Sequence, residues 1–191
     1  GLAAALRATE LGLDTVVVEA GSRPGGRAFT RYEPFGFAWD AGCHWLHSAS
    51  KNLLREAADR EGFTYVKTRG PGYTWSDGAL LSPDEEAQAN KDVEAAYHAV
   101  FAAGHAGQDV PASTVVNLTG PAAATFRWSM NAEWGADPSA VSTLDAVRYQ
   151  DTEENWPVVD GYGALVLHLA QRVLPLVQLN TPVTRITELA R

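Results

Sequence analysis

The stretch EAGSRPGGR, which begins at Glu19, places one carboxylate, a glycine pair and two arginines directly after an apolar run. A carboxylate at the end of the second strand of a βαβ unit can accept hydrogen bonds from both hydroxyls of a ribose. Gly25 and Gly26 would let backbone N–H groups approach an anion without obstruction by a Cβ atom. Arg27 would offer phosphate oxygens a planar fork of donors, and Arg23 would add charge. The stretch therefore predicts a dinucleotide site.

Taken singly, these residues allow simpler interpretations. An acid such as Glu19 also ends many strands that are exposed to water, and a Gly-Gly pair is commonly a plain surface turn. Gly1 adds a third feature, because it lies 18 residues before Glu19, where the last glycine of a truncated G-x-G-x-x-G motif is expected. The three features together favour dinucleotide binding.

The elements that would position these residues form part of a βαβ unit. Residues 1–12 have helical spacing of apolar residues, and Gly12 is the expected C-terminal cap. Residues 15–20, TVVVEA, form a continuous β-branched run, which predicts a parallel strand buried on both faces. Because the chain begins inside this helix with Gly rather than Met, we expect an internal piece of a longer protein whose first strand precedes Gly1.

Short strands and one helix follow. Residues 29–42 carry aromatic residues around proline and glycine, which predicts a short hairpin. Residues 50–61 predict a helix with Ser50 as its N-cap and Gly62 as its C-cap. Two further short strands are expected to turn at Asp77-Gly78.

Helices are predicted for most of the middle of the chain. Ser82, followed by a proline and by Glu85 three residues later, predicts a capping box, and this helix is expected to run to about Ala103. Residues 104–125 are rich in Gly, Ala, Thr and Pro, which predicts a loop. Residues 138–149 predict a further helix.

The C-terminal part predicts a helix over residues 164–174, broken by Pro175, and a strand over 179–189. The block 67–155 is more polar and helical than its flanks and has little parallel-strand signal. We therefore expect residues 1–66 and 156–191 to form one α/β domain, interrupted by a second domain over 67–155.

Composition excludes several classes of partner. The chain has 191 residues and a net charge of −8, without a cluster of five or more Lys and Arg. Nucleic acids and anionic membrane surfaces are therefore poor partners, because both require a concentrated positive surface. No stretch approaches the roughly 18 uninterrupted apolar residues of a membrane span. Cys43 is the single cysteine, which excludes an internal disulfide and indicates a reducing compartment, so we expect a cytoplasmic protein.

Three segments resemble one family of enzymes. VVVEAGSRPGGRAFT, residues 16–30, resembles the second cofactor motif of the flavin-containing amine oxidases, which include monoamine oxidases, polyamine oxidases and related histone demethylases. GFAWDAGCHWLHS, residues 36–48, resembles the segment D-x-G-x-x-W-x-H that the polyamine-oxidase branch places against the flavin ring. VVDGYGALVLHLA and LNTPVTRI resemble the return from the substrate domain into the cofactor domain.

The resemblance implies FAD as cofactor and an α/β fold, in which a partial Rossmann-like FAD-binding domain is interrupted by a mostly helical α+β substrate domain. Glu19 would hold the adenosine ribose, the glycine pair and Arg27 the pyrophosphate, and Val183 the adenine edge. Gly42 would allow the backbone to approach the isoalloxazine. The implied cofactor-binding set is Gly1, Glu19, Ala20, Gly21, Arg23, Gly25, Gly26, Arg27, Gly42, Cys43, His44, Trp45 and Val183.

The resemblance also places His47 and His44 toward the substrate cavity, where an imidazole can bind or deprotonate an amine. The alternative is a packed, hydrogen-bonded histidine beside the cofactor. Cys43 is not expected to bind flavin covalently, because the family's attachment cysteine belongs to a C-terminal motif. The Cys43-His44-x-x-His47 spacing has no fourth ligand nearby, so we expect no metal site. Many members of the family have a lysine that holds a water molecule near the flavin. The corresponding position would lie beyond Arg191, so no catalytic residue is assigned.

The implied reaction transfers hydride equivalents from a C–N bond of a small amine to flavin, with O2 or another acceptor reoxidising the cofactor. Two alternatives stay open: a flavin desaturase or protoporphyrinogen-oxidase-like enzyme, and a dinucleotide-binding module without turnover. For these 191 residues alone we expect little or no activity.

Overall fold

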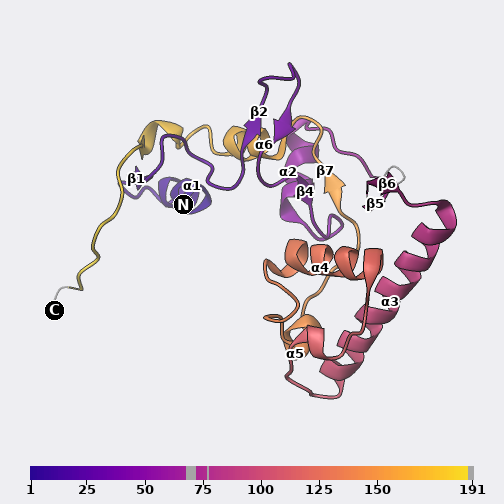
Figure 1. Cartoon of the computed structure of the whole chain (residues 1–191). Coiled ribbons are helices and arrows are strands. Elements are labelled where there is room, and N and C mark those ends of the chain that lie inside the picture. Colours follow the sequence, from indigo (N-terminus) through magenta and orange to yellow (C-terminus); the bar gives the residue numbers. More distant parts are fainter. Residues whose placement is uncertain (68–71, 77, 189–191) are drawn as a thin grey trace. The chain divides into compact units, whose positions relative to one another are not determined.

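The computed structural model describes residues 1–67, 72–76 and 78–188. The chain divides into two compact units (Figure 1). Unit 1 comprises Gly1–Thr68 and Asp151–Arg191, and unit 2 comprises Arg69–Gln150. The assignment of cofactor binding to the outer segments and of substrate binding to the middle block, with boundaries after residues 66 and 155, stays a prediction.

Unit 1 begins with helix α1 (Leu2–Glu10), which is followed by strand β1 (Val17–Val18). Strand β1 pairs in parallel with β8 (Val177–Gln178), and a small core forms under them around Ala5, Ala170 and Val173. The predicted helix is confirmed. The predicted burial of the strand on both faces is wrong, because β8 is the one strand paired with β1 among the described residues, and Val16 and Val18 remain exposed.

The predicted hairpin is confirmed as β2 (Thr30–Arg31) paired antiparallel with β3 (Trp39–Asp40). The next strand, β4 (Trp45–Leu46), pairs antiparallel with the distant β7 (Trp156–Pro157). Leu46 and Val158, both fully buried, form a second small core at this pairing together with Ala49.

Helix α2 (Leu53–Glu61) ends at Gly62 in the left-handed conformation, as predicted. Its N-cap is Asn52 rather than Ser50, because the Asn52 side chain accepts the hydrogen bond from Leu54 N.

Helix α6 (Tyr162–Leu169) begins two residues earlier and ends five residues earlier than predicted. Pro175 lies in the separate 3-10 turn η2 (Leu174–Leu176). The predicted strand over 179–189 is wrong for its described part: residues 179–188 have no regular structure. Asn180 turns with a positive φ, and Pro182 lacks the N–H that a strand ladder requires.

Unit 2 opens with the predicted hairpin, β5 (Trp75–Ser76) paired antiparallel with β6 (Ala79–Leu80). Of the predicted turn, Gly78 has a positive φ and Asp77 lies outside the described residues. The long helix α3 (Pro83–His105) follows, and both hydrogen bonds of the predicted capping box between Ser82 and Glu85 are present.

The remaining helices of unit 2 differ from the sequence prediction. A 3-10 turn, η1 (Ala112–Thr114), and helix α4 (Gly120–Trp134) occupy part of the predicted loop. Of the helix predicted over 138–149, α5 (Thr143–Ala146) forms, because Ser142 caps it after a turn that the Asp137 side chain closes. Helices α3, α4 and α5 bury one apolar core, whose buried members are Ala96, Val100, Ala112, Phe126, Met130, Val141 and Ala146.

The chain is therefore a mixed helix-and-strand protein. Parallel pairing in the described part is limited to β1 and β8, so the Rossmann-like arrangement stays a prediction. None of the described helices combines the length and the apolar character needed to cross a bilayer.

Candidate functional site

A pocket of about 370 Å³ in unit 1 brings together three features that the sequence predicted separately. Gly1 and Leu2 contribute the first residues of α1, Glu19 follows β1, and Gly25 and Gly26 form the opposite turn. Val17, Val18, Val166 and Val177 supply the apolar part of its lining. The pocket thus combines a helix start, a carboxylate and a glycine turn above an apolar sheet edge.

The carboxylate of Glu19 is anchored at one oxygen. Its Oε1 accepts a hydrogen bond of 2.7 Å from Gly21 N, and Oε2 has no partner among the described residues. The Glu19 backbone is fixed as well, because its N–H donates to Gln178 O and its carbonyl accepts from Thr181 N. Glu19, which lines the pocket, is therefore a carboxylate that is held at one oxygen and has a second acceptor oxygen free within the described chain.

The turn at Gly25 and Gly26 has φ values of 97° and 55°, which favour glycine. Within the described chain, the N–H groups of both glycines have no acceptor. Arg23 stabilises the turn by donating to Gly26 O at 2.7 Å and to Pro24 O at 3.3 Å, and its guanidinium lies over the Phe29 ring. The turn can thus offer backbone donors to an anion, whereas Arg23 has a structural task in holding it.

The start of α1 adds further donors. Gly1 is its N-cap and provides no side chain, so the first N–H groups of the helix are left for solvent or a ligand. A helix N-terminus favours an anion through these groups and through the helix dipole. The pocket therefore offers N–H donors for a phosphate, a carboxylate for a ribose and an apolar surface for a base. A dinucleotide such as FAD requires these three kinds of group.

The predicted flavin-facing segment lies beside this turn. A Cβ atom on Gly42 would overlap the carbonyl oxygen of Arg27, and Cys43 N donates to that same oxygen at 2.9 Å. The close backbone approach expected at Gly42 is thus made by Arg27 of the same chain. The side chain of Arg27 is exposed, as is that of Cys43.

Asp40 is the centre of a hydrogen-bond network that sequence reasoning missed. Its Oδ1 accepts from Thr30 Oγ1 at 2.6 Å and from Gly163 N at 3.3 Å. Its Oδ2 accepts from Tyr162 N at 2.9 Å and lies 3.1 Å from His44 Nδ1. Because Gly161, the N-cap of α6, has no side chain, the hairpin provides the cap from a distant part of the sequence. The resemblance motif contained this aspartate, but its spacing alone could not indicate that partner.

The two predicted substrate histidines have different partners. His44 faces Asp40, and its ring packs edge-on against Trp45 with centroids 5.1 Å apart. His47 is exposed, and its Nδ1 lies 2.6 Å from Asn155 Oδ1. Both imidazoles therefore have an oxygen partner at Nδ1.

The other predicted cofactor residues are less closely connected. Ala20 and Gly21 are exposed next to Glu19. Val183 is 62% exposed in the irregular segment that follows the Thr181 contact. Nine predicted cofactor residues do not line the pocket, so their contacts with a cofactor stay predictions: Ala20, Gly21, Arg23, Arg27, Gly42, Cys43, His44, Trp45 and Val183.

Tyr162, at the start of α6, was also missed. Burial raises the pKa of its phenol, and a charge on Cys43 would raise it further. The group is therefore neutral across the physiological range. The Gly-Tyr-Gly sequence around it precedes the helix predicted over 164–174, and no signal in it indicated the contact of its backbone N–H with Asp40.

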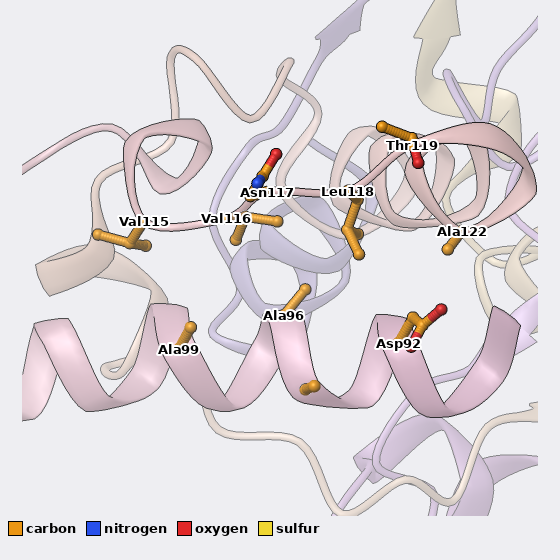
Figure 2. A pocket seen from close by; sticks show the side chains of 10 residues that line it. Asp92, Ala96, Ala99, Val115, Val116, Asn117, Leu118, Thr119 and Ala122 are labelled. Carbon is orange, nitrogen blue, oxygen red and sulfur yellow. The ribbon is translucent and has the colours of Figure 1, made fainter. Parts of the chain in front are cut away.

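Unit 2 contains a second pocket, of about 380 Å³ (Figure 2). Ala96 and Ala99 on α3 form one wall, and Val116 and Leu118 from the segment before α4 face them (Figure 2). Asp92 lies at one end, where it accepts a hydrogen bond from Gln88. None of the predicted site residues lines this pocket. Among the described residues, no group of three His, Cys, Asp or Glu side chains could hold a metal ion.

Solved structures with similar folds include a triple mutant of putrescine oxidase from a redesign of cofactor binding, with a TM-score of 0.63 and 17% identity. Another is cyclohexylamine oxidase from Brevibacterium oxydans IH-35A, with a TM-score of 0.64 and 19% identity. The similarity covers 95% of this chain and 48% and 49% of those chains, respectively. The chain thus spans about half the length of these structures, and the similarity shows the fold. No curated protein matches the chain.

The family model for flavin containing amine oxidoreductase matches residues 1–102, which is more than half of the chain. The matched range includes α1, the Glu19 strand, the glycine turn and the segment with His44 and His47. The chain belongs to the family of flavin-containing amine oxidoreductases, which confirms the resemblance and the FAD cofactor predicted from the sequence.

Proposed function

We propose that the protein is an FAD-dependent oxidoreductase that oxidises a small amine, with O2 as the electron acceptor. The observation that carries this proposal is the pocket of unit 1, where the start of α1, Glu19 and the Gly25–Gly26 turn meet. When bound, FAD supplies the hydride acceptor, and the protein supplies orientation and a surface that excludes water.

Different residues of the pocket would bind different parts of the cofactor. Glu19 Oε2 would accept hydrogen bonds from ribose hydroxyls, since Oε1 is already occupied by Gly21 N. The N–H groups of Gly25 and Gly26 would bind the pyrophosphate, together with the start of α1. The apolar valine side chains would contact the adenosine part.

The substrate class rests on the family and on His44 and His47. Both follow the cofactor turn in the sequence, in the segment whose Cys43 N–H donates to Arg27 O. An imidazole near neutral pH can accept a proton from an ammonium group or bind the neutral amine. An amine oxidised in this way yields an imine, which water hydrolyses.

The test compares flavin retention in Glu19→Gln with that in Glu10→Gln. Glu10 is an exposed acid of the same unit whose ion pair with Arg7 lies on the surface of α1, so it is a matched control. Loss of charge-assisted hydrogen bonds at about 1.5–3 kcal/mol predicts roughly 10- to 100-fold weaker FAD binding by Glu19→Gln. Glu10→Gln should bind FAD like the wild type.

A purified protein that is not yellow, or that binds NAD in place of FAD, would contradict the proposal. For the reaction, hydrogen peroxide release is measured with a panel of small amines under air. Peroxide that appears in step with amine loss supports amine oxidation with O2. Reduction of the flavin by an amine without peroxide would limit the proposal to another acceptor.

A further inference from the structure

The environment of Asp40 determines how its carboxylate can interact with His44. The Asp40 side chain is 1% exposed, and three donors other than His44 point at it: Thr30 Oγ1, Tyr162 N and Gly163 N. The N–H groups of Tyr162 and Gly163 can only donate, and the Thr30 hydroxyl, which accepts from Ala164 N at 2.9 Å, has its own hydrogen to donate to Asp40 Oδ1. Asp40 is therefore an acceptor toward each of these groups.

The fourth partner of Asp40 is His44 Nδ1, at 3.1 Å. Since a carboxylate has no proton to give, His44 Nδ1 must carry the hydrogen. In the neutral imidazole this leaves the lone pair on Nε2. The His44 side chain is 43% exposed and its ring is oriented by edge contact with Trp45, so the ring is held in place and is partly open to solvent.

His47 has a different kind of partner at Nδ1. Its Nδ1 lies 2.6 Å from Asn155 Oδ1, the oxygen of a neutral amide. A proton gained at Nε2 would create an imidazolium next to a carboxylate at His44 but next to an amide at His47. Opposite charge at hydrogen-bond distance stabilises the imidazolium, and an amide dipole does so less.

The other titratable groups on these elements do not reverse the difference in imidazolium stabilisation between His44 and His47. Cys43 precedes His44, and Tyr162 on α6 is neutral because burial raises its pKa. On the His47 side, Asp151 contacts Asn155. Burial acts to raise the pKa of Asp151, but hydrogen bonds from the Glu153 backbone, Ser48 and Asn155 together outweigh it and lower that pKa. Asp151 is thus separated from His47 by Asn155.

We propose that Asp40 is a positioning residue that holds the His44 proton on Nδ1, so that Nε2 of His44, rather than His47, takes a proton from an ammonium substrate. The step moves one proton from the ammonium nitrogen to Nε2 and leaves the amine with its lone pair. The imidazolium that forms is balanced by Asp40. This inference rests on the proposed amine oxidation, and the tautomer part of it can be measured without substrate.

The first measurement is the tautomer of each histidine in the flavin-loaded protein, by 15N NMR with labelled histidine. We expect His44 in the Nδ1–H form in the wild type. Asp40→Asn should populate the Nε2–H form, because the Asn amide can donate to Nδ1. Thr30→Val is the matched control: it removes a neighbouring bond of the same helix cap and should leave the His44 tautomer unchanged.

A wild-type His44 in the Nε2–H form overturns the proposal, as does a tautomer that Thr30→Val alters as much as Asp40→Asn. The wild-type spectrum decides even if Asp40→Asn does not fold.

The second measurement compares His44→Gln with His47→Gln in steady-state amine oxidation. Loss of a proton acceptor should lower kcat/KM of His44→Gln by about 100-fold, whereas His47→Gln should lose less than about 10-fold. An equal or larger loss for His47→Gln overturns the assignment. If no amine is oxidised at all, the proposed function fails, and the NMR result still decides the tautomer.

Discussion

The pockets of the two units have nearly equal volumes, about 370 and 380 Å³, but different chemistry. The pocket of unit 1 is formed by separate segments of the chain and offers a carboxylate oxygen, turn N–H groups and a helix start. The pocket of unit 2 is formed by α3 and the nearby residues 115–122, and its lining includes the polar side chains of Asp92, Asn117 and Thr119 besides alanines and valines. Neither volume nor polarity therefore distinguishes a candidate site, whereas the combination of a carboxylate, a glycine turn and a helix start is found in the pocket of unit 1.

The same contrast appears in how the units are held together. Unit 2 buries one continuous core of aliphatic and aromatic side chains between its helices. Unit 1 has two small cores and relies on backbone groups that approach each other closely, as at Gly163, and on the Asp40 network. Unit 2 has a close approach as well, since a Cβ atom on Gly104 would overlap Thr143 O. Added atoms should therefore harm unit 1 at several positions, and removed atoms should harm mainly unit 2.

The largest effect is expected for Gly163→Ala. Its Cβ would overlap the backbone of Phe29 and Thr30, and these atoms cannot move without breaking the hairpin. We expect a loss of about 4 kcal/mol in unfolding free energy, or complete loss of unit 1. Hydrogen exchange should increase in the hairpin and α6 while α3 and α4 keep their protection.

Gly72→Ala is the control, because a Cβ there meets no atom within 4 Å. It should change the free energy of unfolding by less than about 0.5 kcal/mol. Equal effects of the two substitutions would show that close backbone approach does not limit unit 1.

A smaller effect, confined to unit 2, is expected for Met130→Ala. Met130 is fully buried on α4 within the apolar core, and its truncation leaves a cavity. We expect a loss of about 3 kcal/mol, measured by urea denaturation, with faster hydrogen exchange in α3 and α4. Flavin binding by unit 1 should be retained, and its loss would contradict the separation of the two units.

The smallest effect concerns the capping box of α3 and depends on pH. Hydrogen bonds from Ser82 hold the pKa of the Glu85 carboxyl below its usual value of 4.5. A lowered pKa means that this stabilisation is fully present above pH 4.5 and is lost as the pH falls through the lower pKa of the folded state. Ser82→Ala should cost about 1 kcal/mol at neutral pH.

The measurement is thermal unfolding of unit 2 between pH 7 and pH 3. Ser82→Ala should weaken the pH dependence of the unfolding temperature below pH 4.5. Glu85→Gln should remove the contribution that the Glu85 carboxyl makes to this dependence. A capping-box contribution that grows as the pH falls would contradict the argument.

Much of the fold that depends on neighbouring residues could be predicted. The capping box at Ser82, the left-handed cap at Gly62 and the hairpins all follow from chemistry within a few residues. Helix α4 was missed because the Gly and Pro content near residue 120 indicated a loop, although Pro is compatible with the first turn of a helix. The predicted strand over 179–189 failed because alternation alone provides no pairing partner.

In the candidate site, too, features within a short stretch of sequence could be predicted, and contacts between distant residues could not. Glu19 and the glycine pair could be found because they lie in one short motif, and Gly1 because its spacing to Glu19 is fixed by the βαβ unit. The contacts of Asp40 with Tyr162 and Gly163 could not, since they join residues separated by 122 and 123 positions. The Asp40–His44 spacing of four residues was visible, but without a regular element around it no side-chain contact could be inferred.

The cap of α6 also has a consequence for synthesis on the ribosome. Asp40 and Thr30 emerge more than a hundred residues before the amide groups that they bind. Because the ribosome adds about 5–20 residues per second, roughly 6–25 seconds pass between synthesis of the hairpin and synthesis of α6. The whole of unit 2 is produced in that interval. The cap of α6 can therefore form only after unit 2 has been synthesised, and the pairing of β8 with β1, which completes unit 1, comes later still.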